Sequence, residues 1–162
     1  MAEDLSPADR SSLNAERGPI SMAVGGIIIV EAGPGTTYDA VVARLRERIH
    51  LIPRYRQRLE VPAFGLANPV WIDDDGFDVG WHVRRASLPT PGGEEELAEL
   101  VGREMSRKLD RSRPLWELTV VEGVAGDGGV ALRTKMHRAP VGGGAAALAG
   151  LVGMLFITQP TL

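Results

Sequence analysis

The sequence contains no cysteine among its 162 residues, which excludes disulfide bonds and thiolate metal sites. It also has no excess of positive charge. The formal net charge is −3, so its bulk electrostatics do not attract nucleic acid. Met1–Ser6 is acidic and lacks an apolar stretch, which argues against secretion. We therefore expect a cytoplasmic protein.

The longest apolar run, residues 145–157, is too short to cross a bilayer as a helix, which takes about 20 residues. We expect it to form a buried helix, packed in a larger body than this chain provides. If exposed, it would favour self-association or a peripheral contact with a membrane or lipid droplet. The overall content of 44% hydrophobic and 24% charged residues is typical of a globular protein, and we expect residues 1–162 to form a single domain.

Alternating and β-branched segments predict strands. Residues 22–32 contain Ile27–Val30 between glycine-rich turns, which predicts a buried strand. Residues 77–83 alternate apolar and polar positions, as in a half-buried strand, and His82 falls on the polar side. We expect His82 to be structural or solvent-facing. The polar, turn-rich residues 6–19 predict an entry loop with one helical turn.

Two other segments have a helical pattern. Residues 36–52 repeat apolar positions at helical spacing, from a threonine cap to the stop at Pro53. Residues 94–109 begin with three glutamates and end with basic residues, as the helix dipole favours. Together, these elements predict an α/β fold with a mixed β-sheet flanked by helices.

A pair of strands that ends at His137 organises the chain. Residues 115–122 and 130–137 both have strand patterns, and the turn between them contains Asp127-Gly128, which predicts an antiparallel hairpin. The second strand stops where Ala139-Pro140 and three glycines follow it. An imidazole where a strand gives way to a loop is a common catalytic placement, because the sheet fixes the ring while the loop leaves room for a substrate.

These residues resemble the bacterial wax ester synthase/acyl-CoA:diacylglycerol acyltransferases. The resemblance is carried by Lys135-Met-His137 and by a preceding structural motif, which consists of Asp110, Arg113, Pro114, Leu115 and Trp116. Further landmarks follow in family order at residues 5–9, 53–59, 69–74, 77–78, 82–85 and 88–93. The resemblance covers about residues 5–144. It implies the N-terminal half of a chloramphenicol-acetyltransferase-like (CoA-dependent acyltransferase) architecture, with the C-terminal half absent from this sequence.

The family signature, His-His-x-x-x-Asp-Gly, falls on residues 137–143. His137 and Gly143 match it, whereas Arg138 replaces the second His and Gly142 replaces the Asp. The resemblance implies that the second His is the general base, which takes a proton from the hydroxyl of a fatty alcohol or diacylglycerol. That hydroxyl then attacks the acyl-CoA thioester, and the Asp supports the loop. Both of these positions are altered in this chain.

Arg138 cannot act as that base, because a guanidinium has no acceptor lone pair with which to take a proton. His137 is the remaining candidate. On a regular strand, however, it points to the opposite face from residue 138, so we expect a structural role for it. Arg138 is a candidate for binding a CoA phosphate or a fatty carboxylate.

A basic segment is a second candidate binding surface. Arg54, Arg56 and Arg58, with arginines of the preceding helix, could bind the phosphates of CoA or an anionic lipid surface. The alternative is a solvated face, with Glu47 and Glu60 as partners. We also expect Arg113 to form a buried ion pair with Asp110, and Trp116 to serve packing.

No metal or bound cofactor is expected. Residues 73–78 are rich in aspartate, but their spacing does not match a calcium loop, so a solvated turn is expected. Nucleic-acid binding is not expected either. Acyl-CoA and a lipid or alcohol acceptor are the implied substrates.

Two functions remain open from the sequence. The first is an O-acyltransferase that makes triacylglycerol or wax esters, impaired in this chain and dependent on a separate C-terminal half. The second is a non-catalytic, truncated relative that binds acyl-CoA, lipid or a partner chain.

Overall fold

The computed structural model describes residues 2–139 and 144–156, and only the backbone of residues 144–149. Its main feature is a four-stranded sheet in the order β2-β7-β6-β5. These strands are β2 (Ala23–Glu31), β7 (Gly129–His137), β6 (Trp116–Val124) and β5 (Val83–Ser87). β5 runs parallel to β6, and the other neighbours are antiparallel, so the expected mixed sheet is confirmed.

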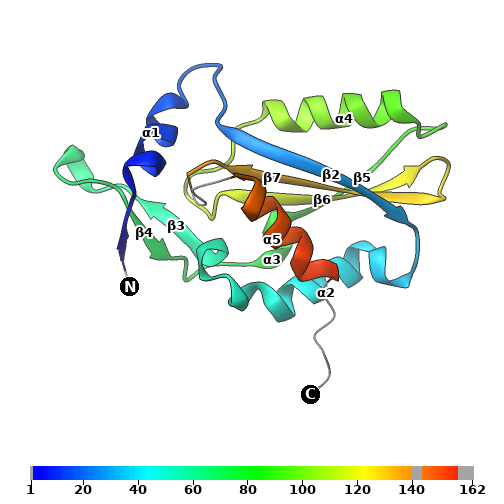
Figure 1. Ribbon diagram of the computed structural model, residues 1–162, viewed down its shortest axis with the longest axis horizontal. Helices are drawn as coiled ribbons and strands as arrows, with labels where there is room; N and C mark the ends of the chain where they lie inside the picture. Colours follow the sequence, from blue (N-terminus) through cyan, green and yellow to red (C-terminus); the bar gives the residue numbers. More distant parts are fainter. Residues whose placement is uncertain (1, 140–143, 157–162) are drawn as a thin grey trace.

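Helices cover both faces of this sheet (Figure 1). α4 (Glu94–Ser106) lies on one face, where Leu97 and Leu100 pack against Val121 and Ala131. α2 (Tyr38–Arg48) and α5 (Gly144–Phe156) lie on the other face. The predicted α/β arrangement of a sheet flanked by helices is therefore correct.

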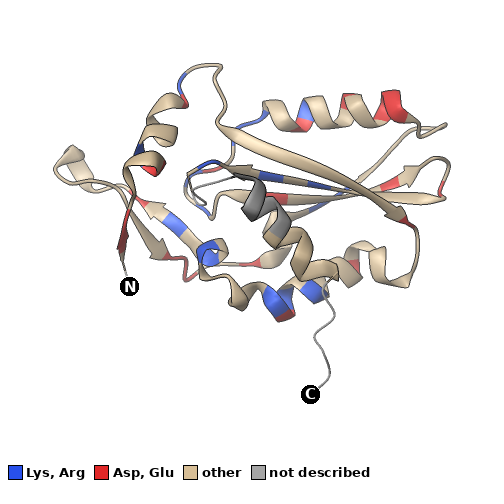
Figure 2. Ribbon diagram, viewed as in Figure 1, with Lys and Arg blue, Asp and Glu red and all other residues tan. Residues whose placement is uncertain are grey.

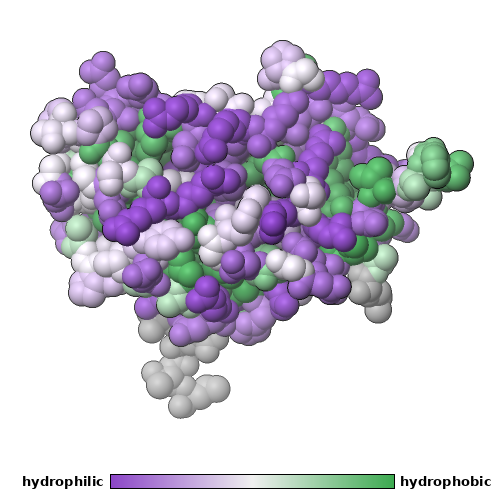
Figure 3. All heavy atoms as spheres, turned by 180° about the vertical axis from the view of Figure 1, so that it is seen from behind, coloured by the Kyte–Doolittle hydropathy of each residue, from purple (hydrophilic) through white to green (hydrophobic). Residues whose placement is uncertain are grey.

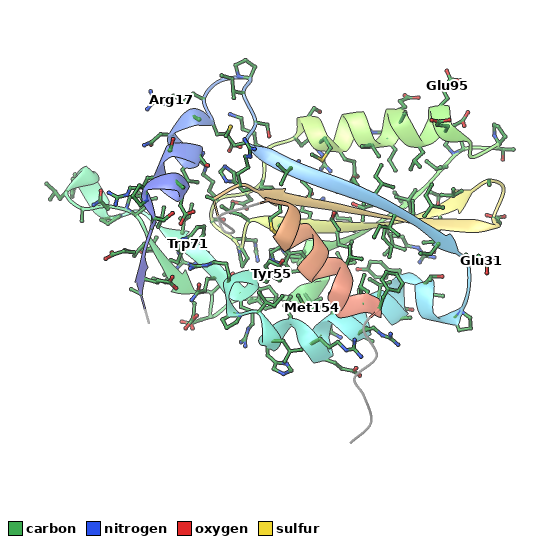
Figure 4. The ribbon with its side chains drawn as sticks, in the orientation of Figure 1. Arg17, Glu31, Tyr55, Trp71, Glu95 and Met154 are labelled. Carbon is green, nitrogen blue, oxygen red and sulfur yellow. The ribbon has the colours of Figure 1, made fainter. Side chains whose placement is uncertain are left out.

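The expected buried helix near the C-terminal end is α5, and it packs within this chain. Leu151, Met154 and Leu155 join the core that α2 and the large sheet form, and Figure 4 shows Met154 and Tyr55 within this layer. Two arginines of α2 bind the last carbonyls of α5. Arg44 donates to Leu155 O at 2.8 Å, and Arg48 donates to Met154 O at 2.9 Å. No helix in the described residues is both long and apolar enough to cross a membrane.

A smaller sheet, two short helices and several 3-10 turns complete the described fold. The sheet has the order β1-β4-β3, formed by Glu3–Asp4, Val70–Asp73 and Gln57–Glu60. Short 3-10 turns lie at Pro34–Thr36, Ile49–Leu51, Pro53–Arg56 and Ala63–Gly65. The loop between β3 and β4 protrudes and exposes Phe64 (95%) and Leu66 (85%), which form an apolar tip in Figure 3.

The structure corrects the expected entry loop. Residues Pro7–Ala15 form a nine-residue helix, α1. It begins with a capping box in which the Ser6 hydroxyl accepts the Asp9 N–H, while the Asp9 carboxylate accepts the Ser6 N–H. Leu13 then anchors the helix in a second core cluster with Leu59 and Trp71. The capping signal, Ser6 followed three residues later by Asp9, is present in the sequence and predicts a helix start, whereas the polar composition of the segment predicts a loop.

Two strand expectations were also wrong. β2 is an edge strand rather than a buried one, and its Ile27 and Ile29 are 42% and 59% exposed. The segment expected to be a strand at residues 77–83 instead contains a helical turn, α3 (Val79–His82). Asp78 caps this turn by accepting the Gly80 N–H at 3.0 Å, so strand β5 starts only at Val83.

Candidate functional site

The candidate site lies where β7 ends, between its two neighbours in the sheet. The His137 N–H donates to Leu115 O, next to β6, and the Arg138 N–H donates to Met22 O, next to β2, both at 3.0 Å. The predicted hairpin of β6 and β7 is confirmed by their antiparallel register. The backbone of both motif residues is thus held on either side by the sheet.

The His137 ring is buried, with 1% of its surface exposed, and both of its nitrogens face protein groups. Nδ1 accepts the Ala139 N–H at 3.0 Å, so in the neutral ring the proton is on Nε2. Nε2 lies 3.4 Å from Glu16 Oε2, just after α1. That distance allows an electrostatic contact, but Nε2 has no hydrogen-bond partner with acceptable geometry.

Glu16 links this ring to two further groups. Its Oε2 accepts the Met22 N–H at 2.9 Å, and its Oε1 lies 3.3 Å from Arg111 Nη2. Burial alone would raise the pKa of Glu16, but the Met22 N–H, His137 and Arg111 together lower it. Glu16 is therefore ionised near neutral pH, and its contact with His137 is one between a carboxylate and an imidazole N–H.

Burial lowers the pKa of His137, and the Arg111 charge lowers it further, against the opposing effect of Glu16. The neutral imidazole is therefore the favoured form near pH 7. Its only lone pair, on Nδ1, is taken by the Ala139 N–H. In this arrangement the ring fixes the turn after β7 and has no free acceptor for a substrate proton.

The side chain of Arg138 is exposed, in contrast to that of His137. Neighbouring residues of a strand point to opposite faces, which agrees with the orientation expected from the sequence. A guanidinium at this position can donate hydrogen bonds to an anion but cannot accept a proton. Two other motif positions, the altered Gly142 and the matching Gly143, lie outside the described residues.

The motif around Trp116 is scaffold in this structure. Pro114, Leu115 and Trp116 are buried, and the Trp116 Nε1–H donates to Tyr55 O at 2.8 Å. The His82 ring stacks on Trp116 with 4.5 Å between centroids, and its Nδ1–H donates to Trp116 O at 2.8 Å. Burial lowers the pKa of His82. His82 is thus a structural residue, and the solvent-facing alternative is wrong.

The expected buried ion pair between Asp110 and Arg113 is not formed. Asp110 is exposed and accepts the Ser112 N–H at 2.9 Å. The Arg113 guanidinium instead lies over the Trp81 ring, with Cζ 4.4 Å from the centroid. The helical turn α3 explains the difference, because it brings an aromatic face within reach of Arg113.

The arginines expected to bind phosphate or lipid have partners within the chain. Arg54 Nη2 lies 2.7 Å from Glu3 Oε1, and Arg58 Nη1 lies 2.6 Å from Glu60 Oε2. The Arg56 guanidinium lies over the Phe77 ring at 6.0 Å. The solvated, locally paired alternative therefore accounts for much of this segment, although partly exposed pairs can still exchange partners with an anionic ligand.

A row of buried charges on β7 was missed from the sequence. Arg133 and Lys135 are each 1% exposed, on the α4 side of the sheet, and Figure 2 shows the basic stretches of β7 beneath α4. Lys135 Nζ donates to Glu104 O at 2.9 Å and also to Arg107 O. Burial lowers the pKa of Lys135. With His137, these residues form one continuous polar face along the strand.

No group of three or more His, Asp or Glu side chains in the described residues could hold a metal ion. The aspartate-rich segment ends β4 and forms a turn, in which Asp74 accepts the Gly76 N–H at 3.1 Å.

The fold places this chain in a recognisable structural class. It superposes on the starter condensation domain of rhizomide synthetase with a TM-score of 0.72 at 13% identity, covering 96% of this chain and 36% of that one. This likeness shows the fold alone, and it corresponds to the N-terminal half of the chloramphenicol-acetyltransferase and condensation-domain architecture.

Sequence comparisons define the family. Residues 5–154 match the wax ester synthase/diacylglycerol acyltransferase catalytic domain, and the chain belongs to this family. It is 44% identical over 144 residues to the probable diacylglycerol O-acyltransferase tgs3 of Mycobacterium tuberculosis, covering 88% of this chain and 53% of tgs3. The wax ester synthase/diacylglycerol acyltransferase of Marinobacter aquaeolei VT8 superposes with a TM-score of 0.71 at 35% identity, covering 91% of this chain and 37% of that one.

The chain thus spans about half the length of tgs3. The chain is also 44% identical over 134 residues to the probable diacylglycerol O-acyltransferase tgs1 of the same organism. That match covers 82% of this chain and 28% of tgs1. The landmarks identified from the sequence are consistent with the matched region.

Proposed function

We propose that this chain is an N-terminal portion of the acyltransferase family that contributes a binding surface, and not a general base, to acyl-CoA-dependent O-acyl transfer. The observation that carries this proposal is the state of the two residues at the end of β7. Arg138 is exposed but cannot accept a proton, and His137 has its lone pair on the Ala139 N–H.

The implied reaction needs a proton acceptor at this place. The acceptor hydroxyl forms a bond to the thioester carbonyl carbon, its proton leaves to a base, and the C–S bond breaks to release CoA. Losing a positioned base typically costs about 10²–10⁴ in rate. We therefore expect this chain alone to be nearly silent towards diacylglycerol or fatty alcohol.

Acyl-CoA binding is the activity that we assign to the remaining site. Arg138 offers an exposed guanidinium beside the strand end, and Arg54, Arg56 and Arg58 offer further positive charge on a neighbouring segment. A guanidinium can bind the oxygens of a phosphate in a bidentate manner. We expect the ligand to be acyl-CoA or an anionic lipid surface, met in the cytoplasm or at a membrane or lipid droplet.

A second candidate is residual catalysis by His137. It is favoured by the carboxylate of Glu16 near Nε2, because a carboxylate that holds one ring nitrogen raises the basicity of the other. That role requires the turn at Ala139 to open, so that Nδ1 becomes free. A separate C-terminal half, supplied by another chain, is a partner that could bring an acceptor to the ring.

The test measures release of free CoA from palmitoyl-CoA, with hexadecanol or dioleoylglycerol as acceptor. The unmodified chain is compared with the double variant Arg138→His, Gly142→Asp, which restores the family motif. We expect no acceptor-dependent release from the unmodified chain. Turnover by the unmodified chain that disappears in His137→Gln would refute the proposal and establish the second candidate.

Binding is measured separately, by titration with palmitoyl-CoA. Arg138→Ala is expected to weaken binding by about tenfold, in line with the loss of one charge-assisted contact. Arg103→Ala is the matched control, because Arg103 is an exposed arginine on α4 with no assigned role in the site. Equal affinity in Arg138→Ala and Arg103→Ala would remove the assignment of Arg138.

A further inference from the structure

The second side of β2 is an open sheet edge. β2 pairs with β7 over its whole length, from Ala23 opposite His137 to Glu31 opposite Gly129. Among the described residues, no other strand pairs with it. The open edge is therefore nine residues long, and β2 has a paired strand on one side only.

The backbone groups at this edge can be assigned from two hydrogen bonds. The Arg138 N–H donates to Met22 O, and the Ala32 N–H donates to Gly128 O, so even-numbered residues bond inward to β7. In an antiparallel ladder, inward and outward residues alternate. The N–H and C=O groups of the odd-numbered residues of β2, from Ala23 to Glu31, consequently point outward.

This edge lacks the features that normally prevent strand addition. Natural edge strands carry lysine, proline or bulges, or are covered. β2 contains no lysine, arginine or proline, and its one charge, Glu31, is the last residue (Figure 4). Ile27 and Ile29 are exposed along the edge and line a hollow of about 700 Å³ with Leu97, Ala98 and Val124.

We propose that β2 is a homodimer interface, in which a second copy of this chain adds its β2 in antiparallel orientation about a two-fold axis at Ile27. The two four-stranded sheets then form one sheet of eight strands, four from each copy. This inference concerns assembly and does not depend on the proposed acyl-CoA chemistry.

The register about Ile27 is self-complementary. It places Ile27 opposite Ile27 of the second copy, Gly25 opposite Ile29, and Ala23 opposite Glu31. All of these positions have outward backbone groups, so each pair can exchange two hydrogen bonds. No two like charges face each other, which would otherwise oppose the pairing.

The side chains fit this register as well. Directly paired residues place their side chains on the same face of a sheet, here the α4 face. Gly25 is exposed, has no side chain, and borders a hollow of about 260 Å³ with Val101 and Met105. The Met105 side chain lies over Gly25, with Sδ 2.9 Å from the position that a Cβ at residue 25 would take. Ile29 of the second copy lies opposite Gly25 and can pack against Met105 and Val101 beside it.

Disulfide trapping gives the sharpest test, because the chain has no native cysteine. In the proposed register, the two Cα atoms of residue 27 are about 5.5 Å apart, within the roughly 4.4–6.8 Å that a disulfide allows. The two residues 28 lie diagonally, at roughly 7–8 Å, and their side chains point to the other face. Ile27→Cys should therefore cross-link on mild oxidation at least about tenfold faster than Ile28→Cys, because pairing raises the effective thiol concentration.

Phe64→Cys is the control for random collision, since Phe64 is highly exposed on a distant loop. Equal cross-linking rates for Ile27→Cys and Phe64→Cys would overturn the proposal. Faster cross-linking of Ile28→Cys than of Ile27→Cys would overturn the register and the axis.

Molar mass in solution tests the same interface without oxidation. Light scattering should give a dimer for the unmodified chain and a monomer for Ile29→Lys, which places a charge against the apolar hollow. Phe64→Lys should remain a dimer, because it makes the same change at an exposed residue outside the interface. A monomeric unmodified chain at a concentration of about 100 µM, or a dimer that persists in Ile29→Lys, would contradict the proposal.

Discussion

Replacing Arg133 with methionine tests the buried charge network between β7 and α4. Arg133 Nη2 lies 2.6 Å from Glu104 Oε2 and 2.7 Å from Thr119 Oγ1. A second carboxylate, Glu117 Oε2, lies 3.5 Å away. The guanidinium is 1% exposed, so water cannot replace it easily when it is removed.

The magnitude follows from what the variant leaves behind. Methionine fills much of the volume, but Glu104 and Glu117 lose the buried cation between them and keep only the partly exposed Arg107 and Arg84 as partners. Removing one partner of a buried ion pair typically costs about 3–5 kcal/mol, a large share of a total stability of roughly 5–15 kcal/mol. We expect Arg133→Met to lower the free energy of unfolding by about this amount.

Urea unfolding followed by tryptophan fluorescence measures this loss, with Arg85→Met as the matched control. Arg85 lies on β5, 3.0 Å from Glu122, but 63% of its side chain is exposed, so its pair should contribute only about 1 kcal/mol or less. The double variant Arg133→Met, Glu104→Gln should recover part of the loss, because it removes one of the two carboxylates that Arg133 neutralises. If Arg133→Met and Arg85→Met lose the same small amount, the buried network does not stabilise the fold as argued.

Two further predictions concern pH and backbone conformation. The free energy of unfolding should fall as the pH drops from 7.5 to 5.5. Burial lowers the pKa of both His82 and His137, so the unfolded chain, with a histidine pKa of about 6.5, binds more protons than the folded one in this range. Urea titrations at both pH values measure the drop, which should be smaller in His82→Phe; an unchanged free energy of unfolding would refute the prediction. Gly92→Ala should destabilise the protein, because Gly92 has φ +70° and a Cβ there would clash with Gly123 O. Thermal unfolding of both glycine variants measures the difference. Gly102→Ala should stabilise α4 by up to about 1 kcal/mol, because there is open space around Gly102. A Gly92→Ala variant more stable than Gly102→Ala would contradict this expectation.

The sequence predicted the elements whose signals are local. The hairpin of β6 and β7 follows from two alternating runs joined by a glycine-rich turn, and both were found. α2 follows from a threonine cap and an apolar stripe, and Thr37 does accept the Ala40 N–H at 3.2 Å. α4 begins at Glu94 as expected but ends at Ser106, so its last predicted turn is not helical. Local patterns fix the type of an element better than its end.

The errors concern properties that no local pattern carries. An apolar run such as Ile27–Val30 predicts a strand, but whether a neighbour covers it depends on the order of strands in the sheet. The alternation on β7 likewise gives two faces, but it does not say what covers the polar one. The sequence also shows that α4 has an apolar stripe, which must pack on a sheet. Helices on both faces would bury Arg133 and Lys135, and they then require carboxylates such as Glu104.

The candidate site shows the same division between local and distant information. Strand alternation was enough to predict that His137 and Arg138 point to opposite faces. It could not identify Glu16, which is far away in the sequence and reaches the ring only because α1 packs beside the end of β7. A histidine can replace a missing base only if one of its ring nitrogens has a free lone pair. With Glu16 at Nε2 and the Ala139 N–H on Nδ1, the substitution at residue 138 has no compensating neighbour in the described part of the chain, which favours a binding role over a catalytic one.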